Sequence, residues 1–141
     1  MKIGSRLDGI IRTVEDDYYE YGAVEVARTF NGVTSTKWLG DSFKLAKALR
    51  DMLLRLHELV GNDQSIVKRL QVVGVATAGL SFQYIRMNHP SGYVCLLQRE
   101  KLQQVPKAVH DLPDLMHLLM NVAQMKVSDP PPFYVVTNMA T

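Results

Sequence analysis

Two acidic residues, Asp8 and Glu25, have the type and spacing to act together. Each lies in a short stretch of β-branched and small residues, so the two are expected on neighbouring strands. Glu25 stands between Val24 and Val26, and a carboxylate on a central strand costs free energy unless it is paired, hydrogen-bonded or metal-bound. Because hard divalent cations prefer carboxylate oxygens, one chemistry open to this pair is coordination of such a cation.

The elements that must position this pair follow from local patterns. Residues 3–14 mix Ile, Leu, Val and Thr around a glycine and predict a strand, and residues 22–29 predict a second strand. The acidic residues 15–17 supply the turn chemistry of a hairpin between the two strands.

The strongest helix signal covers residues 37–60, directly after three hydroxyl residues at 34–36 that can cap a helix. At the helical period its apolar side chains cover a broad arc, and its charged side chains gather on a narrow stripe. Such a helix is expected to lie against a sheet. The arc comprises Trp38, Phe43, Leu45, Ala46, Leu49, Met52, Leu53 and Leu56, and the stripe comprises Lys37, Asp41, Lys44, Asp51 and Arg55.

From residue 70 the pattern changes to three strand-like runs separated by turn signals. Three consecutive antiparallel strands are the simplest account of this pattern. The runs cover residues 70–77, 80–87 and 93–100, with turns at residues 78–79 and 89–92.

The end of the chain predicts a closing helix and a tail. Residues 112–126 carry apolar side chains at helical spacing, and residues 128–141 contain three consecutive prolines that favour an extended chain. A single domain is therefore expected over residues 1–127, followed by a Pro-rich tail over residues 128–141.

Composition limits the classes open to the chain. With 141 residues, of which 47% are hydrophobic and 21% charged, it fits one folded domain. A formal net charge of +2 neither requires nor excludes a nucleic-acid partner. Because Cys95 is the only cysteine, no internal disulfide can form, and an intracellular location is expected, with the nucleus as one option. No stretch of the sequence is long and apolar enough to span a bilayer, so no membrane partner is expected.

The order of these elements carries a resemblance to a known family. The run GSRLDGII, then YGAVEVA and then a long helix resembles the core of the PD-(D/E)XK nuclease superfamily, in which an Asp precedes a (D/E)-x-K tripeptide on the neighbouring strand. The run VVGVATAGLSFQYIRM looks like the hairpin that follows this core in many restriction-type nucleases. The match covers residues 4–99 on short motifs. The runs TKWLGDSFKLAKALRDML, QVVGVATAGL and HPSGYVCLL are also similar to uncharacterised fungal proteins, some of them in Crinkler-like or mobile-element contexts.

The resemblance implies a restriction-endonuclease-like α/β fold, in which helices flank a mixed central sheet, and a metal-dependent nuclease that acts on nucleic acid, with DNA as the first choice. Hydrolysis of a phosphodiester needs a hard divalent cation, Mg²⁺ (or Mn²⁺), to polarise the phosphate and lower the pKa of an attacking water. Asp8 and Glu25 are the candidate metal ligands, and the Val26 carbonyl is a third. Alternation along the strand places the small residues Ala23 and Ala27 beside Glu25, which leaves room for a metal and a phosphate.

One position departs from the family pattern. Where the family has its lysine, this sequence has Ala27. In some members of the superfamily the charged residue has moved to the adjacent helix, and here Lys37 and Lys44 lie on the polar stripe of that helix. The resemblance therefore assigns Asp8 and Glu25 as metal ligands and Lys37 or Lys44 as the catalytic cation. Without such a replacement the domain would bind a metal or nucleic acid and do no hydrolysis.

Each candidate residue also has a structural interpretation. Asp8 fits a turn or bulge residue, and Glu25 fits a salt bridge to Arg6 or Lys37. Lys37 and Lys44 fit a solvated helix face with ordinary ion pairs. The alternative function is then a catalytically degenerate domain of the same fold that mediates nucleic-acid or protein association.

Two further expectations concern metals and partners. Cys95 and the histidines show no tight ligand spacing, so a zinc site is not expected. The chain begins almost at its first expected strand, without the helix that precedes this strand in the family. Either the chain is part of a longer protein, or a partner chain covers the sheet face on which that helix would lie. Exposed apolar surface on this face would predict a homodimer.

Overall fold

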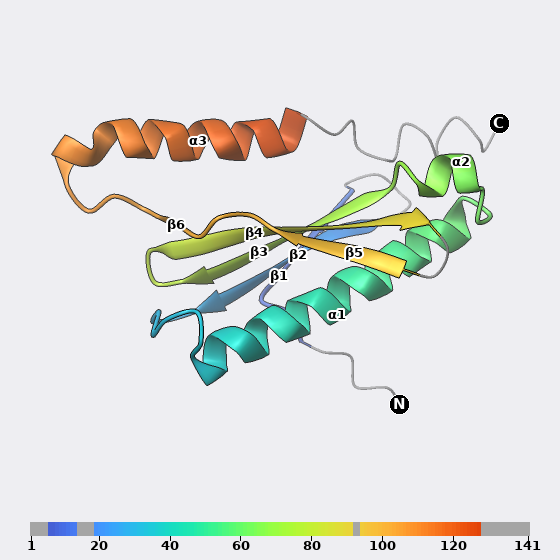
Figure 1. The fold of residues 1–141 in the computed structure, drawn as a ribbon, viewed down its shortest axis with the longest axis horizontal. Helices are drawn as coiled ribbons and strands as arrows, with labels where there is room; N and C mark the ends of the chain where they lie inside the picture. Colours follow the sequence, from blue (N-terminus) through green and yellow to red (C-terminus); the bar gives the residue numbers. More distant parts are fainter. Residues whose placement is uncertain (1–5, 14–18, 92–93, 128–141) are drawn as a thin grey trace.

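The computed structural model describes residues 6–13, 19–91 and 94–127. Within these residues one side of a six-stranded sheet is covered by a long helix, and a second helix lies on the other side (Figure 1). The strands are β1 (Gly9–Arg12), β2 (Glu20–Ala27), β3 (Gln71–Ala78), β4 (Ser81–Ser91), β5 (Val94–Arg99) and β6 (Gln103–Gln104). The helices are α1 (Thr36–Leu59), α2 (Gln64–Val67), the 3₁₀ helix η1 (Val109–Asp111) and α3 (Leu112–Val127).

The sheet is mixed and mostly antiparallel. The strands follow the order β1-β2-β3-β4-β5, and β6 pairs with β4. Only β2 and β3 pair in parallel among the described strands, because the chain crosses over through α1 between them. The α/β class and the mixed sheet expected from the sequence are confirmed, as are the three consecutive antiparallel strands β3 to β5.

Helix α1 begins and ends close to its predicted limits. The Ser35 side chain caps the first turn by accepting a hydrogen bond from the Trp38 N–H, at 3.4 Å. After the last turn Gly61 adopts a left-handed conformation, with φ of 62°, which ends the helix. The helix approaches the sheet closely at Gly74, where an added Cβ would lie 2.9 Å from Leu49 Cδ1.

The buried stripe of α1 differs from the predicted arc at one large side chain. Phe43 was expected among the buried residues and is instead 75% exposed, so that expectation is wrong. The buried positions repeat every three or four residues, and Phe43 falls one position beyond this repeat. One member of the polar stripe, Asp41, is buried as well, and so is its neighbour Ser42. The buried residues of α1 are Trp38, Asp41, Ser42, Leu45, Leu49, Met52, Leu53, Leu56 and His57.

The predictions for the two ends of the chain have different outcomes. The first strand is shorter than predicted, and the expected turn at residues 15–17 and the tail at residues 128–141 lie outside the described residues. The closing helix α3 is confirmed, but it packs against η1 and projects on the side of the sheet opposite α1 (Figure 1). Several of its apolar side chains are therefore exposed, namely Leu112, Met116, Leu119 and Met120.

Across the described part of the chain, the structure has no helix whose length and apolar character would suit a membrane crossing.

Two buried histidines lie side by side between α1 and the sheet. The ring centroids of His57, on α1, and His89, on β4, are 4.7 Å apart. Nε2 of His57 and Nδ1 of His89 have no hydrogen-bond partner within the described chain. Burial lowers the pKa of His57, and the nearby His89 ring lowers it further. The folded protein therefore favours the neutral form of His57.

This burial predicts a loss of stability in weak acid. Because the pKa of His57 in the folded state lies below its ordinary value of 6.5, the unfolded chain takes up a proton first as the pH falls. The contribution of His57 to stability is thus complete above pH 6.5 and decreases below it, by at most about 1.4 kcal/mol per pH unit for one proton. Urea unfolding at several pH values between 7.5 and 5 measures the slope, and His57→Gln should reduce it. The matched change at exposed His110, His110→Gln, should leave the slope unchanged, and an equal slope in wild type and His57→Gln would contradict the assignment.

Candidate functional site

Asp8 directly precedes the first residue of β1 and lies across from β2. Gly9 pairs with Val24 in the antiparallel ladder, so continuing this register places Asp8 opposite Glu25. The Asp8 backbone bends away from the strand, and its Oδ2 accepts a hydrogen bond from the Val26 N–H at 2.8 Å. The Asp8 carboxylate thus accepts the hydrogen bond that the backbone of a further β1 residue would accept from β2.

Glu25 is buried beneath α1. Its side chain is 3% exposed and its Oε1 lies 2.7 Å from Nζ of Lys44, which is 30% exposed. Oε1 has no aligned hydrogen-bond partner within the described chain, so attraction between opposite charges is the main contribution of this contact. The ion-pair partner of Glu25 is thus Lys44, rather than the Arg6 or Lys37 that the structural interpretation of the sequence offers.

Lys37 and Asp41 form a second ion pair within the two helical turns that precede Lys44. Lys37 Nζ lies 2.8 Å from Asp41 Oδ1, and the Lys37 side chain is exposed to solvent. The pKa of Lys37 is raised, chiefly by its hydrogen bond to Asp41 and by the charge of that carboxylate. The charges of Glu25 and Asp8 also raise the pKa of Lys37. All three carboxylates therefore lie close enough to favour its charged form.

These five side chains form what we call the strand–helix cluster. It consists of Asp8 and Glu25 from the strands and of Lys37, Asp41 and Lys44 from α1. Three carboxylates and two ammonium groups leave one negative charge when all are ionised. Within the cluster the contacts are pairwise: Asp8 bonds to the Val26 N–H, Glu25 pairs with Lys44 and Lys37 pairs with Asp41, and the charges of Asp8 and Glu25 also act on Lys37. The structure also adds Asp41, which the sequence placed only on the polar stripe, although its spacing of four from Lys37 is a signal for this ion pair.

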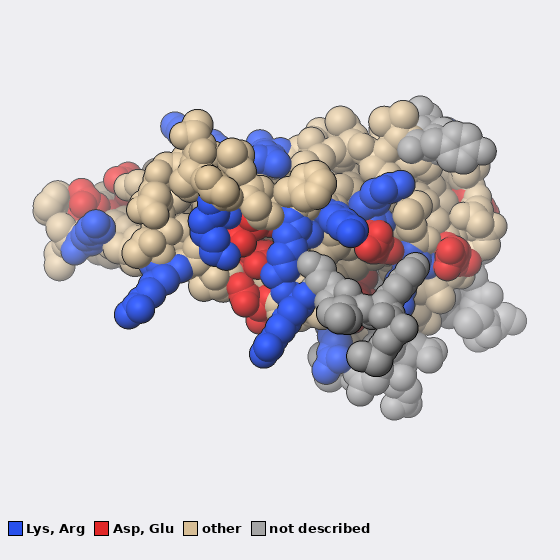
Figure 2. Space-filling model, turned by 90° about the horizontal axis from the view of Figure 1, so that it is seen from below, with Lys and Arg blue, Asp and Glu red and all other residues tan. Residues whose placement is uncertain are grey.

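The surface around the cluster carries further basic side chains. On the face that includes α1, carboxylates lie among a larger number of Lys and Arg side chains (Figure 2). Exposed basic residues of α1 contribute to this surface, namely Lys37, Lys47, Arg50 and Arg55. Basic side chains on one helix face attract the phosphates of a nucleic acid.

The candidate metal ligands are Asp8, Glu25 and the Val26 carbonyl. Within the described residues no group of three or more His, Cys, Asp or Glu side chains lies together as a metal site would require. The N–H of Val26 points to Asp8, and because the N–H and C=O of one strand residue face the same edge, the Val26 carbonyl lies on that side too. Oxygen donors of these types are the ligands that Mg²⁺ prefers in proteins.

Comparison of the chain with protein-family models, with curated proteins and with solved structures finds no match. A functional proposal therefore rests on the geometry of the cluster and on the resemblance in the sequence.

The ion pair between Glu25 and Lys44 predicts a measurable coupling. Lys44→Met leaves a buried carboxylate without its counter-ion, which should lower the free energy of unfolding by about 1–3 kcal/mol, less than the roughly 3–5 kcal/mol of a fully buried pair because Lys44 is partly exposed. Glu25→Gln in the same chain should recover part of this loss. Chemical denaturation of the two single variants and the double variant measures the coupling.

Lys47→Met is the matched control, because Lys47 lies on the same helix and is exposed. It should change stability by no more than about 0.5 kcal/mol. Strictly additive effects of the changes at positions 25 and 44 would show that the two charges are not coupled in solution.

Proposed function

We propose that the chain is a nuclease domain of the restriction-endonuclease-like type that hydrolyses phosphodiester bonds, with DNA as the first substrate to test and Mg²⁺ (or Mn²⁺) as its metal. The observation that carries this proposal is the contact between Lys44 and Glu25. The family's motif lysine is replaced by Ala27, and an ammonium from the adjacent helix stands 2.7 Å from the motif glutamate instead.

The architecture supports the same proposal. An antiparallel pair of strands carries the two acidic residues, a long helix follows, and the next strand returns parallel to the second. This order agrees with the strand, strand and helix order on which the resemblance rests. Ala23 and Ala27 share a sheet face with Glu25, so small side chains flank the carboxylate.

The candidate metal ligands and the two lysines have distinct parts in the proposed chemistry. Asp8, Glu25 and the Val26 carbonyl would hold the ion, which when bound polarises a phosphate and lowers the pKa of an attacking water. Lys44 would stabilise the negative charge that develops on the phosphate oxygens. Lys37 is exposed and lies about two turns nearer the start of α1, where it would contact the incoming phosphate backbone.

One observation favours the alternative of a catalytically degenerate domain. Glu25 is 3% exposed and already lies against the ammonium of Lys44, so its charge is compensated without a metal. Such a domain would keep the basic surface of α1 and bind nucleic acid without cutting it. The two proposals therefore differ in cleavage and in metal uptake.

Cleavage of plasmid and oligonucleotide DNA in Mg²⁺ and in Mn²⁺ tests the nuclease proposal. The wild-type chain should cut with either ion and not in EDTA. Asp8→Asn and Glu25→Gln, which keep side-chain size, should each reduce the rate about 10²- to 10⁴-fold, the range typical for loss of one catalytic group. Lys44→Met should reduce the rate and Lys44→Arg should retain more of it.

Glu20→Gln is the matched control, because Glu20 lies on the same strand and its nearest basic group is Arg55 at 3.8 Å, outside the cluster. It should cut as wild type does. Cutting that survives both Asp8→Asn and Glu25→Gln would remove the cluster from the mechanism. Binding of DNA without cutting, together with no uptake of Mg²⁺ in titration calorimetry, would establish the degenerate alternative instead.

We also propose that the chain forms a homodimer through the side of the sheet opposite α1. Helix α3 projects on that side with exposed apolar side chains, and the sheet face there carries Val26, which is also exposed. Both surfaces belong to the same chain, so a twofold arrangement would let α3 of each copy cover the open sheet face of the other. Apolar surface of this kind on one side of a small domain is typical of an interface.

Light scattering after gel filtration measures the oligomeric state. Wild type should have twice the chain mass of 15.9 kDa, and Leu119→Glu should return it to the single-chain mass. Leu39→Glu is the matched control on α1, because Leu39 and Leu119 are both 51% exposed, and it should leave the mass unchanged. A wild-type monomer, or an equal effect of the two changes, would contradict the interface.

A further inference from the structure

The outer face of α1 exposes a large aromatic side chain. Phe43 is 75% exposed, although burial of an aromatic ring contributes more to folding than burial of most side chains. None of the described helices and strands lies over this side of α1, because the sheet contacts its opposite side (Figure 1). Single exposed apolar residues are common on protein surfaces, so the neighbours of this ring decide whether it belongs to a binding surface.

The nearest outward-facing neighbours of Phe43 toward the end of the helix are cations. Lys47 and Arg50 follow Phe43 by four and seven residues, so at the helical period the three side chains lie along one line on the solvent side of α1. Both cations are exposed, and within the described residues neither forms an ion pair. Leu54 continues the line, which covers about 16 Å of the helix from position 43.

The charge on the solvent side of α1 favours an anionic partner. Basic side chains outnumber carboxylates over the face of the molecule that includes this helix (Figure 2). The exposed charged residues of α1 are the basic Lys37, Lys47, Arg50 and Arg55 and the acidic Asp51 and Glu58. A nucleic-acid strand carries both groups that this surface can bind, because each nucleotide has a phosphate for a cation and a flat base for an aromatic ring.

The exposed ring also selects between the forms of nucleic acid. In a duplex the bases stack on one another and show only their edges in the grooves. In a single strand the flat faces of the bases are accessible, and aromatic side chains stack on them. The Phe43 ring therefore adds affinity for a single strand, whereas Lys47 and Arg50 attract the phosphates of either form.

From these features we infer that the outer face of α1 binds single-stranded DNA, with a base stacked on Phe43 and phosphates held by Lys47 and Arg50. The inference rests on the proposed function for the choice of DNA and adds the form in which the domain takes it. The surface uses none of the five side chains of the strand–helix cluster. Phe43 directly precedes Lys44 in the chain, so a strand bound along this face passes beside the cluster.

Fluorescence anisotropy of the full chain in EDTA, where no metal-dependent cutting can occur, tests this inference with a labelled oligomer of about 12 thymidines and with a DNA duplex of the same length. The thymidine oligomer should bind about tenfold more tightly than the duplex. Phe43→Leu keeps an apolar side chain and removes the ring, so it should weaken single-strand binding about tenfold and leave duplex binding unchanged. Phe43→Trp should retain single-strand binding, because it restores a ring.

The two cations have a different expected signature. Lys47→Gln and Arg50→Gln should each weaken binding of both the single strand and the duplex, because they remove phosphate contacts. Each change should also reduce the slope of log affinity against log salt concentration by about 0.7 for the single strand. Phe43→Leu should leave this slope unchanged.

Lys101→Gln is the matched control, because Lys101 is an exposed lysine that precedes β6 and lies outside α1. It should keep wild-type affinity within twofold. Equal losses in Lys47→Gln and Lys101→Gln would overturn the inference, because general charge attraction would then explain the binding. Tighter binding of the duplex, or of a uridine oligomer of equal length, would overturn the choice of single-stranded DNA.

The outcome for Phe43 also separates this inference from the proposed nuclease function. Single-strand binding that is unchanged in Phe43→Leu, in a chain that still cuts DNA, would overturn the inference and leave the nuclease function standing. Binding that depends on Phe43, in a chain that does not cut, would support the inference and remove the nuclease function. A chain mass that falls in Phe43→Glu would overturn the inference, because this face would then join two copies of the chain.

Discussion

The close packing of α1 on the sheet determines where the charged groups of the helix lie relative to Glu25. Gly74 has no side chain, so Leu45 and Leu49 reach the sheet surface directly above it. Gly74 pairs with Ala23, and Glu25 lies two residues further along the same face of β2. Lys44 directly precedes Leu45, so the contact that seats the helix also brings the Lys44 ammonium to Glu25. A larger residue at position 74 would move the helix outward and separate the two charges.

The limits of the long helix could be predicted because they depend on local chemistry. The cap at Ser35 and the left-handed Gly61 are encoded within a few residues of the helix ends, and α1 was predicted to within one residue at each end. The position of the helix around its own axis was less predictable. Apolar periodicity treats every large apolar side chain alike and therefore includes Phe43 in the buried arc. Only a narrower stripe of α1 faces the sheet, and Phe43 lies outside it.

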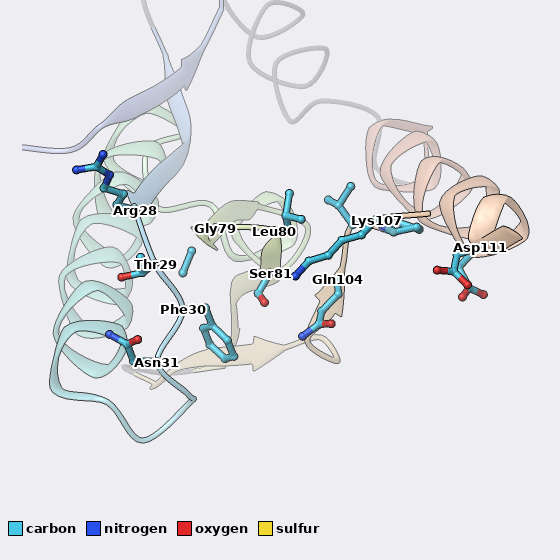
Figure 3. A pocket seen from close by; sticks show the side chains of 14 residues that line it. Arg28, Thr29, Phe30, Asn31, Gly79, Leu80, Ser81, Gln104, Lys107 and Asp111 are labelled. Carbon is cyan, nitrogen blue, oxygen red and sulfur yellow. The ribbon is translucent and has the colours of Figure 1, made fainter. Parts of the chain in front are cut away.

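The site could be predicted in its residue types but not in its pairing. The sequence proposes Asp8 and Glu25 together with Lys37 or Lys44. It does not decide between the lysines, because the distance from a helix residue to a strand residue depends on packing between segments far apart in the chain. The structure places Lys44 at Glu25 and gives Lys37 to Asp41. The pocket of about 840 Å³ at the carboxyl ends of β2 and β3 could not be predicted for the same reason, since residues 28–31, 78–81 and 104–107 line it together with Asp111 and Asp114 (Figure 3).

The hydrogen bond from the Val26 N–H to Asp8 also protects an edge of the sheet. Strand β1 is only four residues long, so β2 extends beyond it and would otherwise present an unpaired donor toward solvent. An open strand edge of this kind can recruit a strand from another molecule and begin aggregation. The Asp8 carboxylate occupies that donor and brings a negative charge, which opposes the approach of a foreign strand. A ligand that binds Asp8 and breaks this hydrogen bond would therefore expose the Val26 N–H, to which a strand of another molecule could pair.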